Sequence, residues 1–288
     1  MSLTVFQGLG TVLVSLERQY GWSRTALSGA FSLARVEGAV LGPIEGVLVD
    51  RVGTRRMVLI GFILMGLGFV WLSQVDTLWE FYAAFMTISL GSGLGGWLAI
   101  VAMVNNWFDK RRTFAMSIAM SGIHLGGLLV PIFALSIENF NFSITTIAVG
   151  VVLLIVVGPA TFIIRGKPED MGLLPDGDIG YGDGFSSNPE RGKMAGEYSW
   201  SLHDALRTTT LWRLVVVFGV STLGMGSYGL HRIAFFIDRG FDSQLVAYAS
   251  SMEAGIAGVT VFFIGLVLER VPPRVIGALA FWGVAVGI

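Results

Sequence analysis

The sequence predicts an all-α membrane protein built from two related halves. Hydrophobic residues make up 53% of its 288 residues and charged residues only 14%, whereas an ordinary globular domain has about 25% charged residues. The apolar residues fall into long runs, most of them near the roughly 20 residues that a membrane-spanning helix needs. A charged loop that occurs twice, in corresponding places, indicates a duplicated helical bundle.

Charged and turn-rich breaks divide the chain into nine predicted membrane segments. These segments cover residues 1–16, 24–49, 56–75, 79–107, 113–136, 142–165, 210–237, 243–268 and 275–288. The first and last are shorter than a full span, so we expect a truncated first helix and an incomplete C-terminal half. Gly-rich patterns at 42–46, 91–95 and 122–126 are expected to let helices approach closely.

The longest polar stretch predicts the boundary between the halves. Residues 166–209 are rich in Gly, Ser, Pro and charge, which is typical of a linker. We therefore expect an N-terminal six-helix half over 1–165 and the start of a C-terminal half over 210–288. A short amphipathic helix over Trp200–Arg207, capped by Ser201, is expected near the end of the linker.

The distribution of Lys and Arg predicts the orientation. Of the 19 Lys and Arg residues, 14 lie in loops on the side of the loop Asp50–Arg56, three in the opposite loops and two within spans. Positive loops face the cytoplasm, so this loop is predicted to be cytoplasmic, in a bacterial inner membrane or a plasma membrane.

The repeated loop lies after the second segment and again after the eighth. Its first copy, Gly46–Arg56, reads Gly-Val-Leu-Val-Asp-Arg-Val-Gly-Thr-Arg-Arg. Five of its positions map onto later ones at a constant offset of 219, four with the same residue and one with Glu for Asp: Gly46, Asp50, Arg51, Val52 and Arg55 correspond to Gly265, Glu269, Arg270, Val271 and Arg274.

The first copy resembles the loop between helices two and three of the major facilitator superfamily, G-x-x-x-D-R-x-G-R-R, with Thr54 replacing the first Arg of the final pair. The second copy resembles its degenerate echo between helices eight and nine, with Pro272 and Pro273 in place of the Gly. The resemblance covers essentially the whole chain. It implies a twelve-helix bundle, of which about nine helices are represented, and transport by alternating access around a central site.

The resemblance also implies a gate, because in this superfamily the equivalent Asp and Arg latch the two halves together on the cytoplasmic side. The alternative is that these charges only anchor the topology. The candidate gate residues are Gly46, Asp50, Arg51, Gly53, Arg55, Arg56, Glu269, Arg270 and Arg274.

Two short stretches narrow the resemblance to the oxalate/formate-antiporter and monocarboxylate-transporter-like branch. One is the central loop, Pro168–Gly177 with Ala205–Trp212. The other is the end of segment seven, where His231, Asp238 and Gly240 fit H-x-x-P-[FY]-x-x-D-x-G, although Ala234 replaces the Pro. The branch implies a small organic anion, such as a monocarboxylate, as substrate, with a proton as one option for the coupling ion.

Polar side chains inside the predicted spans are the candidate substrate or coupling residues, because a charge at bilayer depth costs at least about 2.5–3.5 kcal/mol. On segment two, Arg35 and Glu45 are expected on one face, with Glu37 nearly opposite Arg35. The resemblance places spans five and eight face to face, so His124 and Glu253 could carry a proton; alternatively they form a static pair or never meet. The full candidate set is Arg35, Glu37, His124, His231, Arg232 and Glu253.

Several functional classes are not indicated. A net charge of −1 argues against a nucleic-acid partner, and three scattered His with no Cys give no metal site. No phosphate-binding or dinucleotide fingerprint occurs, so we expect no cofactor and no enzymatic activity. The expected partners are the lipid bilayer and a small molecule, with a monomeric chain. Two alternatives stay open: a proton-driven exporter of drug-like or other metabolites, and a non-transporting sensor or inactive fragment.

Overall fold

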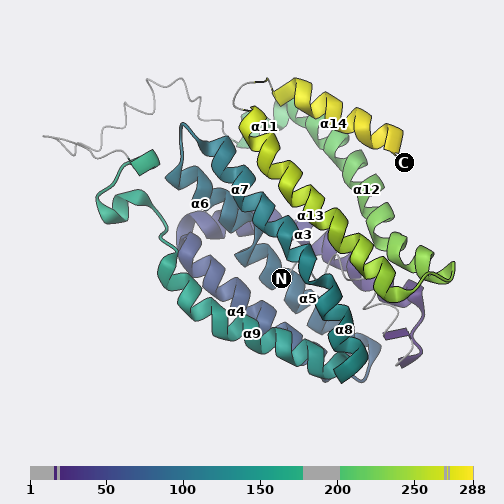
Figure 1. Ribbon diagram of the computed structural model, residues 1–288. Helices are drawn as coiled ribbons and strands as arrows, with labels where there is room; N and C mark the ends of the chain where they lie inside the picture. The colour runs from purple at the N-terminus through teal and green to yellow at the C-terminus, as the bar shows by residue number, and fades with distance from the viewer. Residues whose placement is uncertain (1–15, 18–19, 178–201, 269–270, 272, 288) are drawn as a thin grey trace, which may run out of the picture. The chain divides into compact units, whose positions relative to one another are not determined.

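The computed structural model describes residues 16–17, 20–177, 202–268, 271 and 273–287, and none of these lies in a β-strand (Figure 1). The chain divides into two compact units, residues 1–179 with 233–288, and residues 180–232. The first predicted segment, 1–16, lies almost wholly outside the described residues, as does Ser201. The predicted division into two halves stays a prediction.

The first part of the larger unit contains α3 (Arg24–Val52), α4 (Thr54–Leu72), α5 (Leu78–Gly95) and α6 (Trp97–Trp107). Side-chain caps set the starts of α3 and α5. The Ser23 hydroxyl accepts a hydrogen bond from the backbone of the third residue after it, and Thr77 with Glu80 forms a complete capping box at α5.

It continues with α7 (Arg112–Leu125), the 3₁₀ turn η1 (Gly126–Leu129), α8 (Val130–Phe140) and α9 (Phe142–Ile163). Two predicted segments are thus interrupted. Segment 79–107 breaks at Gly96, where a Cβ would meet the carbonyl oxygen of Ser92. Segment 113–136 changes to 3₁₀ geometry ahead of Pro131, which has no N–H to give to the helix and whose ring clashes with the preceding turn.

The described C-terminal helices are α11 (Leu202–Arg207), α12 (Thr209–Asp238), α13 (Ser243–Leu268) and α14 (Pro273–Gly287). They agree with the predicted segments to within a few residues, and α11 covers the described part of the predicted amphipathic helix. The linker begins with two 3₁₀ turns, η2 (Pro168–Met171) and η3 (Pro175–Gly177).

Five helical stretches among the described residues are long and apolar enough to cross a membrane: Thr54–Leu72, Leu78–Trp107, Arg112–Phe140, Phe142–Ile163 and Ser243–Leu268. Helix α3 is long enough, but it carries Arg35, Glu37 and Glu45 along its length. Helix α12 contributes a shorter apolar stretch, Thr209–Gly224.

Helix α4 packs between α5 and α9, and small residues make both contacts close. A Cβ on Gly61 would meet the backbone of Gly91 and Gly95 on α5, and one on Gly66 would meet α9 at Gly150 and Leu154. The predicted close packing at 91–95 is therefore confirmed.

Candidate functional site

The predicted loop Gly46–Arg56 is mostly helical: it comprises the end of α3, a one-residue turn and the start of α4, and we call this end of the larger unit the motif end. Gly53 is the single residue between the two helices and has φ 88°, a left-handed conformation that favours Gly. Its N–H donates to the carbonyl oxygen of Val49 at 3.0 Å. The motif needs Gly here because it closes one helix and opens the next.

Among the described residues, the charged side chains of Gly46–Arg56 make one contact with another helix. The Arg55 guanidinium carbon lies 5.7 Å from the centre of the Phe162 ring on α9, a cation–π contact. Asp50, Arg51 and Arg56 are exposed, and no hydrogen bond or ion pair links them to another described residue. Glu269 and Arg270 lie outside the described residues, as does the side chain of Arg274, so the latch stays a prediction.

Helix α13 lies antiparallel along α7, η1 and α8, and we call this contact the seam (Figure 1). Small residues line it. A Cβ on Gly265 would meet Ser117, and one on Gly258 would lie 3.3 Å from Leu125. Further along, the Ser251 hydroxyl donates to the carbonyl oxygen of Gly127 at 3.2 Å. The expectation that spans five and eight face each other is confirmed.

His124 is next to Leu125, which packs against Gly258, and Glu253 is five residues before Gly258 on α13. No hydrogen bond or ion pair between His124 and Glu253 is among the described contacts. Glu253 is exposed and His124 is half-buried. At 100° per residue, Glu253 lies about 200° around α13 from Ser251, which faces the seam. The proton pair therefore stays a prediction.

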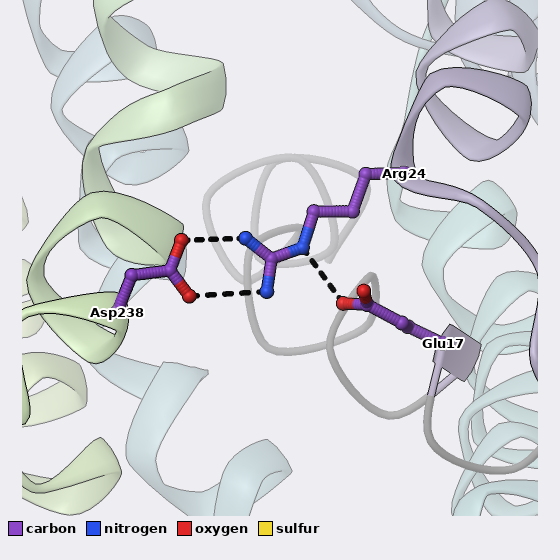
Figure 2. Close-up of polar contacts among 3 residues, drawn as sticks. All are labelled: Glu17, Arg24 and Asp238. Atoms are coloured by element: carbon purple, nitrogen blue, oxygen red, sulfur yellow. Dashed lines mark hydrogen bonds and ion pairs between the residues drawn. The ribbon is translucent and has the colours of Figure 1, made fainter.

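At the end of α3 opposite to the motif, Arg24 forms a three-residue ion-pair cluster (Figure 2). Its Nη1 and Nη2 donate to Asp238 Oδ2 and Oδ1 at 2.6 and 3.1 Å, and its Nε donates to Glu17 Oε2 at 2.7 Å. These hydrogen bonds hold the pKa of the Asp238 carboxyl below its usual range. The bidentate pair links residues 214 positions apart.

A second polar contact lies at the same end of the seam. The Glu138 carboxylate, near the end of α8, accepts hydrogen bonds from the Ser243 hydroxyl at 3.2 Å and from Gln244 Nε2 at 2.9 Å. Because α3 has about 26 residues, or about 39 Å, between Arg24 and Asp50, the two contacts are far from the motif. We call this end the far end.

The carboxyl groups of Glu37 and Glu45 on α3 lie against α5. Glu37 forms a hydrogen bond with Ser89, and Glu45 lies against Gly93, so both contact α5. Glu45 is only 6% exposed, whereas Arg35 is exposed. Arg35 and Glu45 therefore differ in exposure, although both lie on α3. On a helix, Glu45 is about 80° from Arg35 in one direction and about 80° from Glu37 in the other. The packing of α5 on this side means that Glu45 shares its environment with Glu37.

His231 and Arg232 follow one another on α12 within the smaller compact unit. The side chain of His231 is outside the described part, and that of Arg232 is partly exposed. The role of these two residues as substrate or coupling candidates stays a prediction. The described residues also contain no cluster of three or more His, Asp or Glu that could hold a metal ion.

The start of the linker docks on the motif end, a contact that the sequence did not predict. The Asp176 carboxylate accepts hydrogen bonds from the backbone N–H groups of Lys110 at 2.8 Å and Asp109 at 3.2 Å. These bonds, led by the one from Lys110, keep the pKa of Asp176 below its usual range. The Trp107 indole also donates to the carbonyl oxygen of Arg165 at 2.9 Å.

Long apolar helices, a charged turn at one end and polar contacts at the other define a multi-pass membrane protein. The chain belongs to the Major Facilitator Superfamily, since the model of that family matches residues 1–288. The Paecilomyces divaricatus "Agnestins efflux protein AgnL12" is 26% identical over 84% of this chain and 51% of its own length.

Two further relatives match a smaller share of the chain. The Oxalobacter formigenes "Oxalate:formate antiporter" is 27% identical over 50% of this chain and 35% of its own length. The mouse "Monocarboxylate transporter 14" is 27% identical over 43% and 24%. The chain thus spans about half the length, or less, of these three relatives. The names of the antiporter and of the monocarboxylate transporter agree with the branch that the sequence resembles.

Proposed function

We propose that this chain acts in the secondary active transport of a small organic anion, such as a monocarboxylate, by alternating access. The observation that carries the proposal is the seam, where α13 packs on α7 and α8 through small residues and the far end is joined by polar contacts. Such a seam can separate at one end while the helices stay intact, which is what alternating access requires.

The anionic substrate is supported by Arg35 and by the names of two relatives. Arg35 is exposed and lies about 22 Å along α3 from Asp50, which supports a cation at membrane depth. The two carboxyl groups nearest to it on α3 are turned towards α5. We propose that Arg35 is the residue that attracts the anion.

Uptake into proteoliposomes tests this function. Radiolabelled carboxylates and a neutral solute are offered with and without an imposed pH gradient. We expect Arg35→Gln to raise the apparent KM for carboxylates and to leave a neutral solute unaffected, since only a charged ligand loses an electrostatic contact. Arg213→Gln, a change of another exposed Arg, is the control. Equal losses for both solutes would contradict an anion site.

A proton as coupling ion is part of the same proposal, with His124 and Glu253 as its carriers. Imidazole and carboxyl groups can each bind and release a proton, and both residues lie within predicted membrane spans. The pH profile of uptake in His124→Gln and Glu253→Gln proteins tests the idea. Proton-driven accumulation that persists in both variants with an unchanged profile would exclude these carriers.

The gate role of Asp50 and Arg51 is also a proposal, and it concerns a state in which the motif end is closed. Asp50→Asn should leave expression near normal, because the carboxylate is exposed and unpaired among the described residues. It should slow turnover, because the closed state would lose the latch contact. Normal turnover in that variant would contradict the latch.

A second function, export of a larger metabolite, is favoured by one comparison. Of the three relatives, the one that matches the largest share of the chain has a name that includes efflux. Transport by inside-out vesicles, with the pH gradient imposed in each direction, separates the two functions. Accumulation of apolar metabolites rather than carboxylates would favour export.

A further inference from the structure

We propose that Arg24 and Glu138 are gate residues that hold the far end of the seam closed, and that their contacts with the α12–α13 turn break whenever the transporter opens at that end. This inference rests on the proposed function, since only a transporter that alternates has a far end to open. Arg24 and Glu138 lie outside both motifs described above, whereas their partner turn includes Asp238 of the branch motif.

One short turn receives both contacts. Helix α12 ends at Asp238, Gly240 takes a left-handed φ of 88°, and α13 begins at Ser243. The Asp242 carboxylate accepts a hydrogen bond from the backbone N–H of Gln244 at 2.9 Å, so the start of α13 is fixed. The turn therefore presents Asp238 to α3 and Gln244 to α8 as one rigid piece.

Arg24 and Asp238 are at helix ends where their own charges are unfavourable. Arg24 is the first residue of α3, yet the positive end of the helix dipole lies there. Asp238 is the last residue of α12, where the dipole is negative. Neither charge helps its own helix, but each neutralises the other in the bidentate pair. Residues that break a local rule in this way are expected where function requires them.

The contacts are suited to opening because water can replace them. The side chains of Glu17, Arg24 and Asp238 are 37%, 43% and 53% exposed. Breaking an exposed ion pair leaves each group hydrated, so the energetic cost is small. Glu17 stays with Arg24 on the same side of the seam and would keep the guanidinium partly neutralised after Asp238 leaves.

The experiment measures the opening directly, in the full-length protein in lipid nanodiscs. Because the sequence has no Cys, Gln74→Cys and Leu245→Cys introduce the only two thiols of these 288 residues for nitroxide labels. Both positions are exposed at the far end, one after α4 and one on α13. Electron–electron double resonance then gives the distance distribution between the two labels.

In Arg24→Gln we expect the long-distance population to rise by about fivefold relative to the short one, the change that a single exposed ion pair can supply. Glu138→Ala should act in the same direction. The double variant Arg24→Asp with Asp238→Arg should recover part of the short distance, because it restores opposite charges. Arg239→Gln is the matched control, because Arg239 is an exposed Arg of the same turn whose guanidinium carbon lies 4.6 Å from the centre of the Phe235 ring on α12.

An unchanged distribution in Arg24→Gln, or an equal change in Arg239→Gln, would overturn the proposal. Should Arg24→Gln fail to fold, Asp238→Asn decides by the same criterion, because it keeps the contact of Arg24 with Glu17. The distance measurement needs no substrate. If the Arg24→Gln variant shows the longer distances but the protein transports no carboxylate, the proposed function is contradicted while the gate role of Arg24 is supported.

Discussion

The two ends of the seam are held together by different kinds of contact. At the motif end, Gly265 lies directly against Ser117, and the Phe114 and Phe262 rings are 5.9 Å apart between centroids. At the far end, charged and amide groups meet in exposed positions, led by the ion pair of Arg24 with Asp238. Apolar and backbone packing loses contact steeply with small gaps, whereas exposed polar groups exchange partners with water. The far end is therefore the easier end to open from this conformation.

The largest effect is expected from Gly265→Ala. The new methyl group would meet both Ser117 Oγ and Cβ, and Cβ cannot rotate away, so α7 and α13 must separate. Overpacking of this kind costs about 1–3 kcal/mol. Thermal unfolding in detergent should show a lower Tm than wild type.

Gly277→Ala on α14 is the control for that change, because nothing lies within 4 Å of the added carbon. It should be neutral or slightly stabilising, since Ala favours a helix. Adding Ser117→Gly to Gly265→Ala should recover part of the loss. Equal Tm values for Gly265→Ala and Gly277→Ala would show that α7 and α13 are not in close contact at Gly265.

A somewhat smaller effect is expected from Gly53→Ala in the motif turn. A left-handed φ of 88° costs an L-residue about 1–2 kcal/mol. The control is Gly46→Ala, which lies within α3 with nothing near the added carbon. Chemical denaturation should rank Gly53→Ala below Gly46→Ala, and the reverse order would contradict the strained turn.

High salt should loosen the far end more than the motif end. Exposed ion pairs are screened, and the Debye length falls from about 10 Å at 0.1 M to about 3 Å at 1 M. The label pair at positions 74 and 245 should shift to longer distances in 1 M salt. A second pair, Thr113→Cys with Leu266→Cys at the motif end, should change little; an equal shift there would remove the contrast between the ends.

The smallest effect concerns the linker and depends on pH. The lowered pKa of Asp176 means that its hydrogen bonds to Lys110 and Asp109 add stability above the ordinary pKa of an Asp, and that this contribution is lost as pH falls through the lowered value. Exchange of the Lys110 amide hydrogen, followed by mass spectrometry and corrected for intrinsic rates, should lose protection at the acid end. Asp176→Asn should lack this pH dependence, and an identical profile would contradict the docking.

Helix positions could largely be predicted from the sequence, because hydrophobic length and charged breaks are local properties. The segments 210–237 and 243–268 match α12 and α13 closely. The interruptions at Gly96 and Gly126–Leu129 were not predicted, although both carry a local signal: a Gly with no side chain, and a Pro one turn later. The Gly pattern at 91–95 forms a close contact, whereas Gly42 and Gly122 have nothing near them. Pattern alone does not reveal which face meets a neighbour.

The sequence by itself determined the membrane class, the family and the repeated loop, because composition, hydrophobic length and a fixed spacing do not depend on tertiary contacts. Only the tertiary structure decided which charges meet. In the sequence, Arg24 is not distinguishable from the other Arg residues in loops, because its partner Asp238 lies 214 residues away. Glu45 is equally close in angle to Arg35 and to Glu37 until α5 packs on one side. Side-chain pairing depends on where helices cross, and that depends on packing among all of them.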